Sequence, residues 1–479
     1  MLRLTWVQPE DLLGHELRQA RLDGREPSAI EARWRAAGGP DAPPRAGAST
    51  HRASRYLRLL AEDLLDELAD LPSALSDDEP TDLARITSLC VDWPMPPGRA
   101  DAPSSGCGPV AADRAVPRAP EGALVAAPSP AGLEAAWLGR AIGCLLGKPV
   151  EKLPLDGIRA LAQAAGNWPL TAYFTAVGVP EDLLAAHPWN RRSAPTSLAE
   201  NIDGMPEDDD LDYPLVNLLL LRRHGKTFTT ADVARLWLDE LPPGRTFTAE
   251  RIAYRNLLSG ISPPHTARHR NPFREWIGAL IRADVHGWTN PGDPAAAAEQ
   301  AHRDAVLTHT ANGVYAAMFT AAVIATAATG DHDVHACLRS GRRVIPPRSR
   351  LARAIDHAVQ LAEHHEDFEA VVDELHARYS ATHHWVHAVP NTALLAAALT
   401  HADGDFTGSI CRAVSGGLDT DSVGATAGSV AGLLAGDPAA LPERWRAPLK
   451  NRLATTVADF DGTGFDTLAH LTHLEATRS

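Results

Sequence analysis

Hydrophobic residues along most of this chain recur at the three-to-four-residue spacing of helices, and alternating strand-like patterns are scarce. Helical patterns run from Pro9 to Asp23 and from Tyr56 to Leu71. Helical periodicity resumes at Leu133 and continues through a succession of Ala-rich segments, and no regular repeat of solenoid length is present. The pattern therefore predicts an all-α fold with a globular, multi-helix body.

A chain of 479 residues is longer than one ordinary hydrophobic core requires. Its composition divides it into three parts. Residues 1–85 are predicted to form a small helical N-terminal extension. Residues 86–131 are dominated from Trp93 onward by Pro, Ala, Gly and Ser; they bury too little apolar surface to stay ordered alone and are interpreted as a linker. Residues 132–479 are expected to form the main domain.

Charge and apolar content exclude several classes of protein. The net charge of −15, without a basic stripe, argues against general nucleic-acid binding. The most apolar long stretch, Ala316 to Gly330, is too short to span a bilayer and predicts a buried helix. The five cysteines are scattered without disulfide or zinc spacing, and the start lacks a signal peptide's apolar core. We expect a cytoplasmic protein without a membrane partner; its oligomeric state stays open.

The run from Gly416 to Gly428 places two carboxylates, Asp419 and Asp421, on a tight turn that leads into a helix of small residues. Inside a regular helix these two side chains would point to different faces, but at a turn they can converge on one point. Two close carboxylates repel unless a cation lies between them. Oxygen-only ligands favour magnesium, calcium or manganese over zinc.

A second acidic cluster, Asp208 to Asp210, precedes the apolar run 215–221. Because proline is best tolerated in a first helical turn, Pro214 predicts that these aspartates lie on the loop or cap just before a buried helix. Either cluster alone is more typical of helix N-capping than of a metal site. Together they exceed what two caps require, which favours a metal site.

Two sets of glycines recur every four residues and so line one face of each predicted helix. A glycine inside a helix costs about 1 kcal/mol relative to alanine, which close packing near a buried site would offset. We expect close helix contacts along Gly139, Gly143, Gly147 and along Gly424, Gly428, Gly432.

Together these segments resemble the ADP-ribosylglycohydrolases, a family related to the dinitrogenase-reductase-activating glycohydrolases. Residues 139–151 are similar to its opening Gly-x-x-x-Gly helix, which ends at an acidic residue, here Glu151. Asp208 to Asp210 resembles its Thr-Asp-Asp motif, and 419–422 resembles its Asp-Thr-Asp-Thr motif. Residues 304–315 are similar to its middle segment, which lies near bound ADP-ribose. The likeness spans about residues 131–479.

The resemblance implies two magnesium ions, with manganese as a possible replacement, and a set of site residues. The implied metal ligands are Asp208, Asp209, Asp210, Asp419, Asp421 and Ser422. The implied catalytic residues are Glu151 and Asp209. The implied substrate contacts are Asn312 and Gly313 at the diphosphate, Tyr315 on the adenine or else in the core, and His387 and Asn391 as orienting groups.

This chain departs from the family pattern at four positions, one of which, Ser422 in place of threonine, keeps the hydroxyl ligand. Asp208 stands where many members carry threonine, so Glu207 remains an alternative ligand. Cys144 stands where many carry aspartate, and Lys148 follows the last glycine of the opening motif, so substrate preference is expected to differ.

The implied function is magnesium-dependent hydrolysis of the glycosidic bond in an ADP-ribosylated protein or small ADP-ribosyl conjugate, with release of ADP-ribose. Two alternatives remain. One is a catalytically silent relative that binds ADP-ribose or serves structurally. The other is a different magnesium-dependent nucleotide hydrolase, which would use the same ligands with another pocket.

Overall fold

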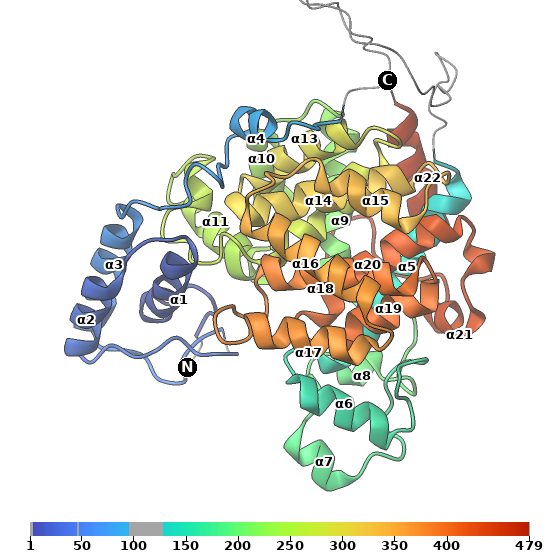
Figure 1. Cartoon of the computed structure of the whole chain (residues 1–479), viewed down its shortest axis with the longest axis horizontal. Coiled ribbons are helices and arrows are strands. Elements are labelled where there is room, and N and C mark those ends of the chain that lie inside the picture. Colours follow the sequence, from blue (N-terminus) through green and yellow to red (C-terminus); the bar gives the residue numbers. More distant parts are fainter. Residues whose placement is uncertain (1–2, 46, 95–127, 479) are drawn as a thin grey trace, which may run out of the picture.

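The computed structural model describes residues 3–45, 47–94 and 128–478. Within these ranges the chain forms 22 α-helices, six short 3-10 helices and no β-strand (Figure 1), which confirms the predicted all-α fold. Most of the predicted linker, 86–131, lies outside the described residues. No described helix is both long enough and apolar enough to cross a lipid bilayer.

The helices fall into an N-terminal group and a larger body. The N-terminal group comprises α1 (Pro9–Leu22), α2 (Ser28–Ala36), α3 (Arg55–Ala69) and α4 (Leu83–Leu89). The first half of the body comprises α5 (Pro130–Gly147), α6 (Leu155–Ala164), α7 (Glu181–Ala186), α8 (Ala194–Ser197), α9 (Asp209–His224), α10 (Thr230–Glu240), α11 (Thr248–Leu258), α12 (Asp284–Trp288) and α13 (Pro294–Ala305). The second half comprises α14 (Ala311–Ala327), α15 (Val334–Arg342), α16 (Arg350–His364), α17 (Phe368–Tyr379), α18 (Ala388–Ala402), α19 (Phe406–Ser415), α20 (Thr420–Ala435), α21 (Glu443–Arg446) and α22 (Phe465–Thr477).

Helices α5 and α20 pack backbone to backbone along the two glycine faces, as the four-residue spacing predicts. A Cβ atom on Gly143 would lie 1.9 Å from the carbonyl oxygen of Gly424, and one on Gly428 would lie 1.9 Å from that of Gly139. At the end of α5, the Thr420 hydroxyl donates a hydrogen bond of 2.9 Å to the carbonyl of Gly147. The close approach fixes the start of α20 against the end of α5.

Helix α9 begins earlier than Pro214 predicts. Asp208 is its N-cap, and Pro214 lies inside the helix, so the expectation that Pro214 sits in the first turn is wrong. Proline has no N–H to donate to the carbonyl four residues earlier, that of Asp210. The Arg140 side chain supplies the missing donor, with Nε 2.7 Å from that carbonyl oxygen. The proline is therefore tolerated, and Asp209 and Asp210 lie in the first turn of the helix.

The N-terminal helices share one hydrophobic core with the body; in Figure 1, α1, α2 and α3 lie together at the left edge and α4 lies near α10. The indole of Trp6 packs edge-on against Phe273 and Trp276. Buried charges also cross this contact, because Arg274 pairs with Glu16 at 2.6 Å and with Asp23 at 2.5 Å. The sequence boundary expected near residue 131 thus separates segments whose side chains pack together.

The glycine contact between α5 and α20 is testable by one added methyl group. We expect Gly143→Ala to lower the free energy of unfolding by about 1 to 3 kcal/mol, because the two backbones must separate to admit the Cβ atom. Urea denaturation of the purified protein measures this. Gly244→Ala is the matched control, since a Cβ atom there meets nothing within 4 Å. Equal stability of the two variants would contradict the close contact.

Candidate active site

Three helix ends meet around a cavity of about 610 Å³. The start of α9 and the start of α20 each bring an acidic cluster, and the end of α5 runs through a short 3-10 helix, Lys148–Val150, to Glu151. All of the predicted metal ligands and Glu151 line this one cavity: Glu151, Asp208, Asp209, Asp210, Asp419, Asp421 and Ser422. The structure therefore brings together side chains that lie far apart in the sequence.

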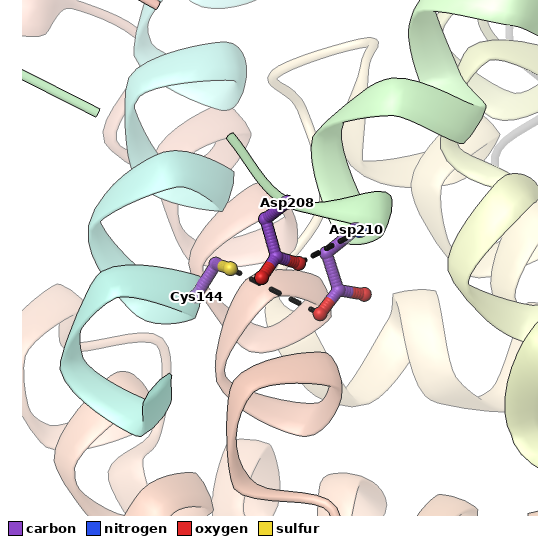
Figure 2. A group of neighbouring side chains, drawn as sticks. All are labelled: Cys144, Asp208 and Asp210. Carbon is purple, nitrogen blue, oxygen red and sulfur yellow. Dashed lines mark hydrogen bonds between the residues drawn. The ribbon is translucent and has the colours of Figure 1, made fainter. Parts of the chain in front are cut away.

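The acidic side chains form two groups within the cavity, each able to place three ligand atoms within 4.8 Å of one another. One group is Glu151 with Asp419 and Asp421. The other is Cys144 with Asp208 and Asp210, which point toward one another from α5 and from the start of α9 (Figure 2). In this second group the Asp208 carboxylate accepts the backbone N–H of Asp210 at 2.9 Å, so it serves as the helix cap as well.

Cys144 is a member of this group that the sequence did not single out as a ligand. Its Sγ atom lies 3.9 Å from the Asp210 carboxylate. Burial, together with the neighbouring Asp208 and Asp210, raises the pKa of the Cys144 thiol well above its usual value. The side chain therefore remains a thiol, and the oxygen atoms are the charged donors of the site. Cys144 lies four residues before Lys148, a spacing that puts both side chains on the same side of a helix. This spacing is the feature of the sequence from which the position of Cys144 in the site could have been predicted.

Burial and mutual repulsion raise the pKa values of several carboxyl groups in this cavity. Desolvation raises the pKa of Asp209, Asp210 and Asp419 well above the ordinary range, and the neighbouring carboxylates raise it further. The pKa of Asp421 rises to about 7, through burial and then through Glu151 and Asp208. Five carboxylates crowded in this way favour a bound cation.

Asp210 also has a buried oxygen atom, Oδ1, with no hydrogen-bond partner among the described residues. The nearest cation, Arg140, lies 3.5 Å from that oxygen, but its guanidinium is already held by Asp284 at 2.8 Å and by the Ile281 carbonyl at 2.6 Å. A buried polar atom left without a partner is costly. This oxygen, together with the hard donor set, fits a divalent metal ion.

Lys148 supplies one positive charge inside the cluster. Its ammonium group pairs with the Asp208 carboxylate and lies 3.3 Å from the Glu207 carbonyl. Burial by itself lowers the pKa of this lysine, but Asp208 and the other anionic neighbours more than offset that effect, so the pKa is raised. Lys148 therefore stays charged and neutralises part of the acidic group. In the sequence, Lys148 is visible only as a departure from the family motif, and its ion pair with Asp208 is not.

The structure distinguishes the roles of the other acids near the start of α9. Glu207 turns to the rim of the cavity, where it pairs with Arg245 at 2.9 Å, whereas Asp208 lies beside Asp210. Asp212 points away and accepts hydrogen bonds from Thr455 and Thr456. Burial raises the pKa of Asp212 to about 6. Asp208 is thus closer to the candidate metal position than Glu207.

Asn391 and His387 lie behind the cavity and support it. The Asn391 side-chain oxygen accepts the backbone N–H of Asp419 at 3.1 Å, and its amide donates to the carbonyls of Trp385 and His387. His387 caps α18 through a bond from the Val389 N–H, and its Nε2 lies 3.6 Å from the carboxylate of Glu275. Neither side chain lines the cavity.

The structure does not bring Asn312, Gly313 and Tyr315 to the acidic cavity. All three are buried: residues 79–81 of the N-terminal segment cover Asn312 and Tyr315, and Gly313 packs against the backbone of Arg274 and Glu275. The Asn312 amide donates to Glu79 at 2.9 Å, and the Tyr315 hydroxyl donates to the Pro80 carbonyl. These polar groups are therefore occupied by the protein itself, which the pattern around residues 304–315 does not reveal.

A comparison with known protein families gives one match, to the model described as ADP-ribosylglycohydrolase, over residues 132–477. The chain belongs to the ADP-ribosylglycohydrolase family. The matched region contains both acidic clusters and Glu151, whereas helices α1–α4 precede it.

Two individual proteins are similar to this ADP-ribosylglycohydrolase family member. An uncharacterized protein of Archaeoglobus fulgidus is 26% identical over 316 residues, which cover 66% of this chain and 90% of that protein. A solved structure titled "ADP-ribosylglycohydrolase-related protein complex" is 20% identical, covers 72% of this chain and 97% of its own, and superposes with a TM-score of 0.45.

Magnesium is expected to stabilise the folded protein. Bound cations relieve repulsion among the cavity carboxylates, and at about 100 times the dissociation constant such binding contributes about 2.7 kcal/mol. Thermal unfolding across a magnesium titration, with a chelator-treated sample as reference, measures the shift. Sodium chloride at matched ionic strength is the control for screening. A melting temperature independent of magnesium would contradict the metal assignment.

Lys148→Met is expected to tighten magnesium or manganese binding by about tenfold, since the ammonium group competes with the cation for Asp208. Isothermal titration calorimetry of the chelator-treated protein measures the change. Lys226→Met is the control, because Lys226 bonds to the Ala476 carbonyl away from the cavity. Weaker binding in Lys148→Met would mean that the lysine orients Asp208 for the metal rather than competing with it.

Proposed function

We propose that this protein hydrolyses the glycosidic bond of an ADP-ribosylated protein or small ADP-ribosyl conjugate and releases ADP-ribose. The observation that carries the proposal is the meeting of two acidic groups, from the starts of α9 and α20, in one cavity of the family-matched region. We further propose two magnesium ions, replaceable by manganese. Asp208, Asp209 and Asp210 would hold one, and Asp419, Asp421 and Ser422 the other.

The chemistry required at this cavity is cleavage at the ribose C1″ atom through an oxocarbenium-like state. When bound, divalent cations supply positive charge that orients sugar hydroxyls and promotes loss of a proton from water. The protein contributes Glu151, whose carboxylate is held by the Asn190 amide at 2.6 Å and by Lys152 at 2.7 Å. So oriented, Glu151 contacts the ribose or takes up a proton from the attacking water.

Asp209 is proposed as the second catalytic residue. Its side chain lines the cavity, it lies between Asp208 and Asp210 in the sequence, and burial followed by the neighbouring carboxylates raises its pKa. A bound cation reverses that tendency and keeps the carboxylate ionised. Asp209 can then accept a proton or a hydroxyl hydrogen bond from the substrate.

We also propose a cytoplasmic location. The four cysteines that the structure describes, Cys90, Cys144, Cys337 and Cys411, are unpaired and buried. Free thiols of this kind are typical of a reducing compartment.

The activity is tested by incubating the protein with ADP-ribosyl-arginine, ADP-ribosyl-serine and O-acetyl-ADP-ribose, with and without magnesium, and measuring free ADP-ribose chromatographically. We expect release from at least one substrate, only with magnesium. Absence of release from all three would contradict the proposal.

Asp209→Asn and Asp419→Asn are expected to lower turnover at least about 100-fold, because even indirect partners of a metal ion contribute 10- to 100-fold. Helical content should persist, since each change removes a charge from a repelling group. Circular dichroism measures the helical content, and the release assay measures the turnover. Asp203→Asn is the control, because Asp203 is exposed and pairs with Lys450. Near-normal turnover at saturating magnesium would make the altered residue a helix cap and not a ligand.

A further inference from the structure

A second cavity, of about 380 Å³, adjoins the acidic one. The two share Lys152 and Trp385 in their linings. The second cavity lies between the N-terminal segment, which contributes Arg18 and Arg45, and the body, which contributes Lys152 and residues 376–385. Its volume is within the range of ligand pockets, roughly 300 to 1,000 Å³.

This second cavity is basic, in a chain with a net charge of −15. Of the residues that the structure describes, Arg18, Arg45 and Lys152 line it with cationic side chains, and no aspartate or glutamate does. The neighbouring cavity differs, since it is lined by eight acidic residues: Glu151, Glu207, Asp208, Asp209, Asp210, Glu250, Asp419 and Asp421. The acidic cavity also contains basic residues, but carboxylates outnumber them there, so the basic cavity suits the anionic part of a ligand better.

Arg18 is the central cation of this wall. It lies on α1, partly buried, and among the described residues no carboxylate or carbonyl accepts a hydrogen bond from it. Burial lowers its pKa, as expected for a guanidinium without a compensating anion. Other arginines at the same contact are compensated: Arg25 pairs with Glu16 at 2.9 Å, and Arg274 pairs with Glu16 and Asp23. Arg18 thus presents to the cavity a guanidinium group that no described carboxylate pairs with.

Trp385 provides an aromatic wall between the two cavities. The Lys152 ammonium lies 5.8 Å from the centre of its ring. Its buried indole Nε1 has no hydrogen-bond partner among the described residues. An aromatic face beside cationic groups suits a purine base next to phosphates, because bases stack on such faces and guanidinium groups bind phosphate oxygens in pairs.

We propose that the basic cavity holds the adenosine diphosphate part of the substrate while its distal ribose lies in the acidic cavity, so that Arg18 and Arg45 complete the substrate site. The inference rests on the proposed function. It also draws on the position of residues 79–81, since these cover Asn312, where the family likeness predicts the diphosphate, and Tyr315, which that likeness places on the adenine or in the core. The N-terminal segment therefore removes one subsite and builds another.

The test measures binding of ADP itself, by isothermal titration calorimetry, to the full-length protein with magnesium present. Charge-assisted hydrogen bonds are the strong ones, so we expect Arg18→Gln with Arg45→Gln to weaken ADP binding at least about tenfold. Arg18→Lys, which keeps the charge, should recover part of the loss. Arg33→Gln is the matched control: it removes the same charge from the same segment, where Arg33 is exposed and pairs with Glu67.

Two further measurements separate binding from folding and from catalysis. The melting temperature and its magnesium-induced shift should be unchanged in the double variant, because neither Arg18 nor Arg45 forms an ion pair or side-chain hydrogen bond with another described residue. In the hydrolysis assay, the double variant should raise KM while kcat stays within about twofold, as for loss of uniform binding.

The outcomes distinguish this inference from the proposed function. ADP binding that depends on Arg18, without hydrolysis of any ADP-ribosyl substrate, would support the basic subsite and overturn only the proposed reaction. Hydrolysis with the same KM in the double variant and in the unaltered protein would overturn the subsite and leave the reaction standing. Undetectable ADP binding, or equal binding by the double variant, would also overturn the subsite.

Discussion

The close contact between α5 and α20 is the constraint on which the site depends. Glycines face backbone carbonyls along this contact, and a single Cβ atom at Gly139, Gly143 or Gly147 would come within 2.3 Å of the opposite backbone. The contact sets the end of α5, with Lys148 and Glu151, directly against the turn that carries Asp419 and Asp421. Side chains that bind a cation must converge within a few tenths of an ångström, and direct backbone packing provides that rigidity.

The acidic cavity stores unfavourable electrostatic energy in the folded chain. Its carboxylates outnumber the cations that contact them, and Arg140 is diverted to Asp284 and to backbone carbonyls. The fold is nonetheless held in place around this repulsion, because Arg140 also satisfies the carbonyl that Pro214 leaves without a donor. One buried arginine thus permits the proline, completes the first turn of α9 and keeps Asp210 facing the cavity.

Features encoded within short segments could be predicted from the sequence. The helical class follows from periodicity, and the acidic turns and glycine faces follow from spacing, so each could be located by residue number. The pairing of Lys148 with Asp208 could not, because it joins residues 60 apart through the fold. The covering of Asn312 by Glu79 spans 233 residues and depends on how two groups of helices pack, which no local pattern specifies. The prediction that Pro214 lies in the first turn of α9 was wrong for a related reason, since the donor that compensates for the proline, the Arg140 side chain, comes from another helix.

The buried ion pairs between the N-terminal helices and the body have a consequence for synthesis. Glu16 leaves the ribosome 258 residues before its partner Arg274, a delay of roughly 10 to 50 s at ordinary translation rates of about 5–20 residues per second. Throughout that interval, Glu16 can pair with Arg25 but not with Arg274, and the part of α1 that packs against the body lacks its counterpart. Helix α1 can dock only late in translation, so the nascent chain must keep this segment from wrong partners until most of the body has emerged.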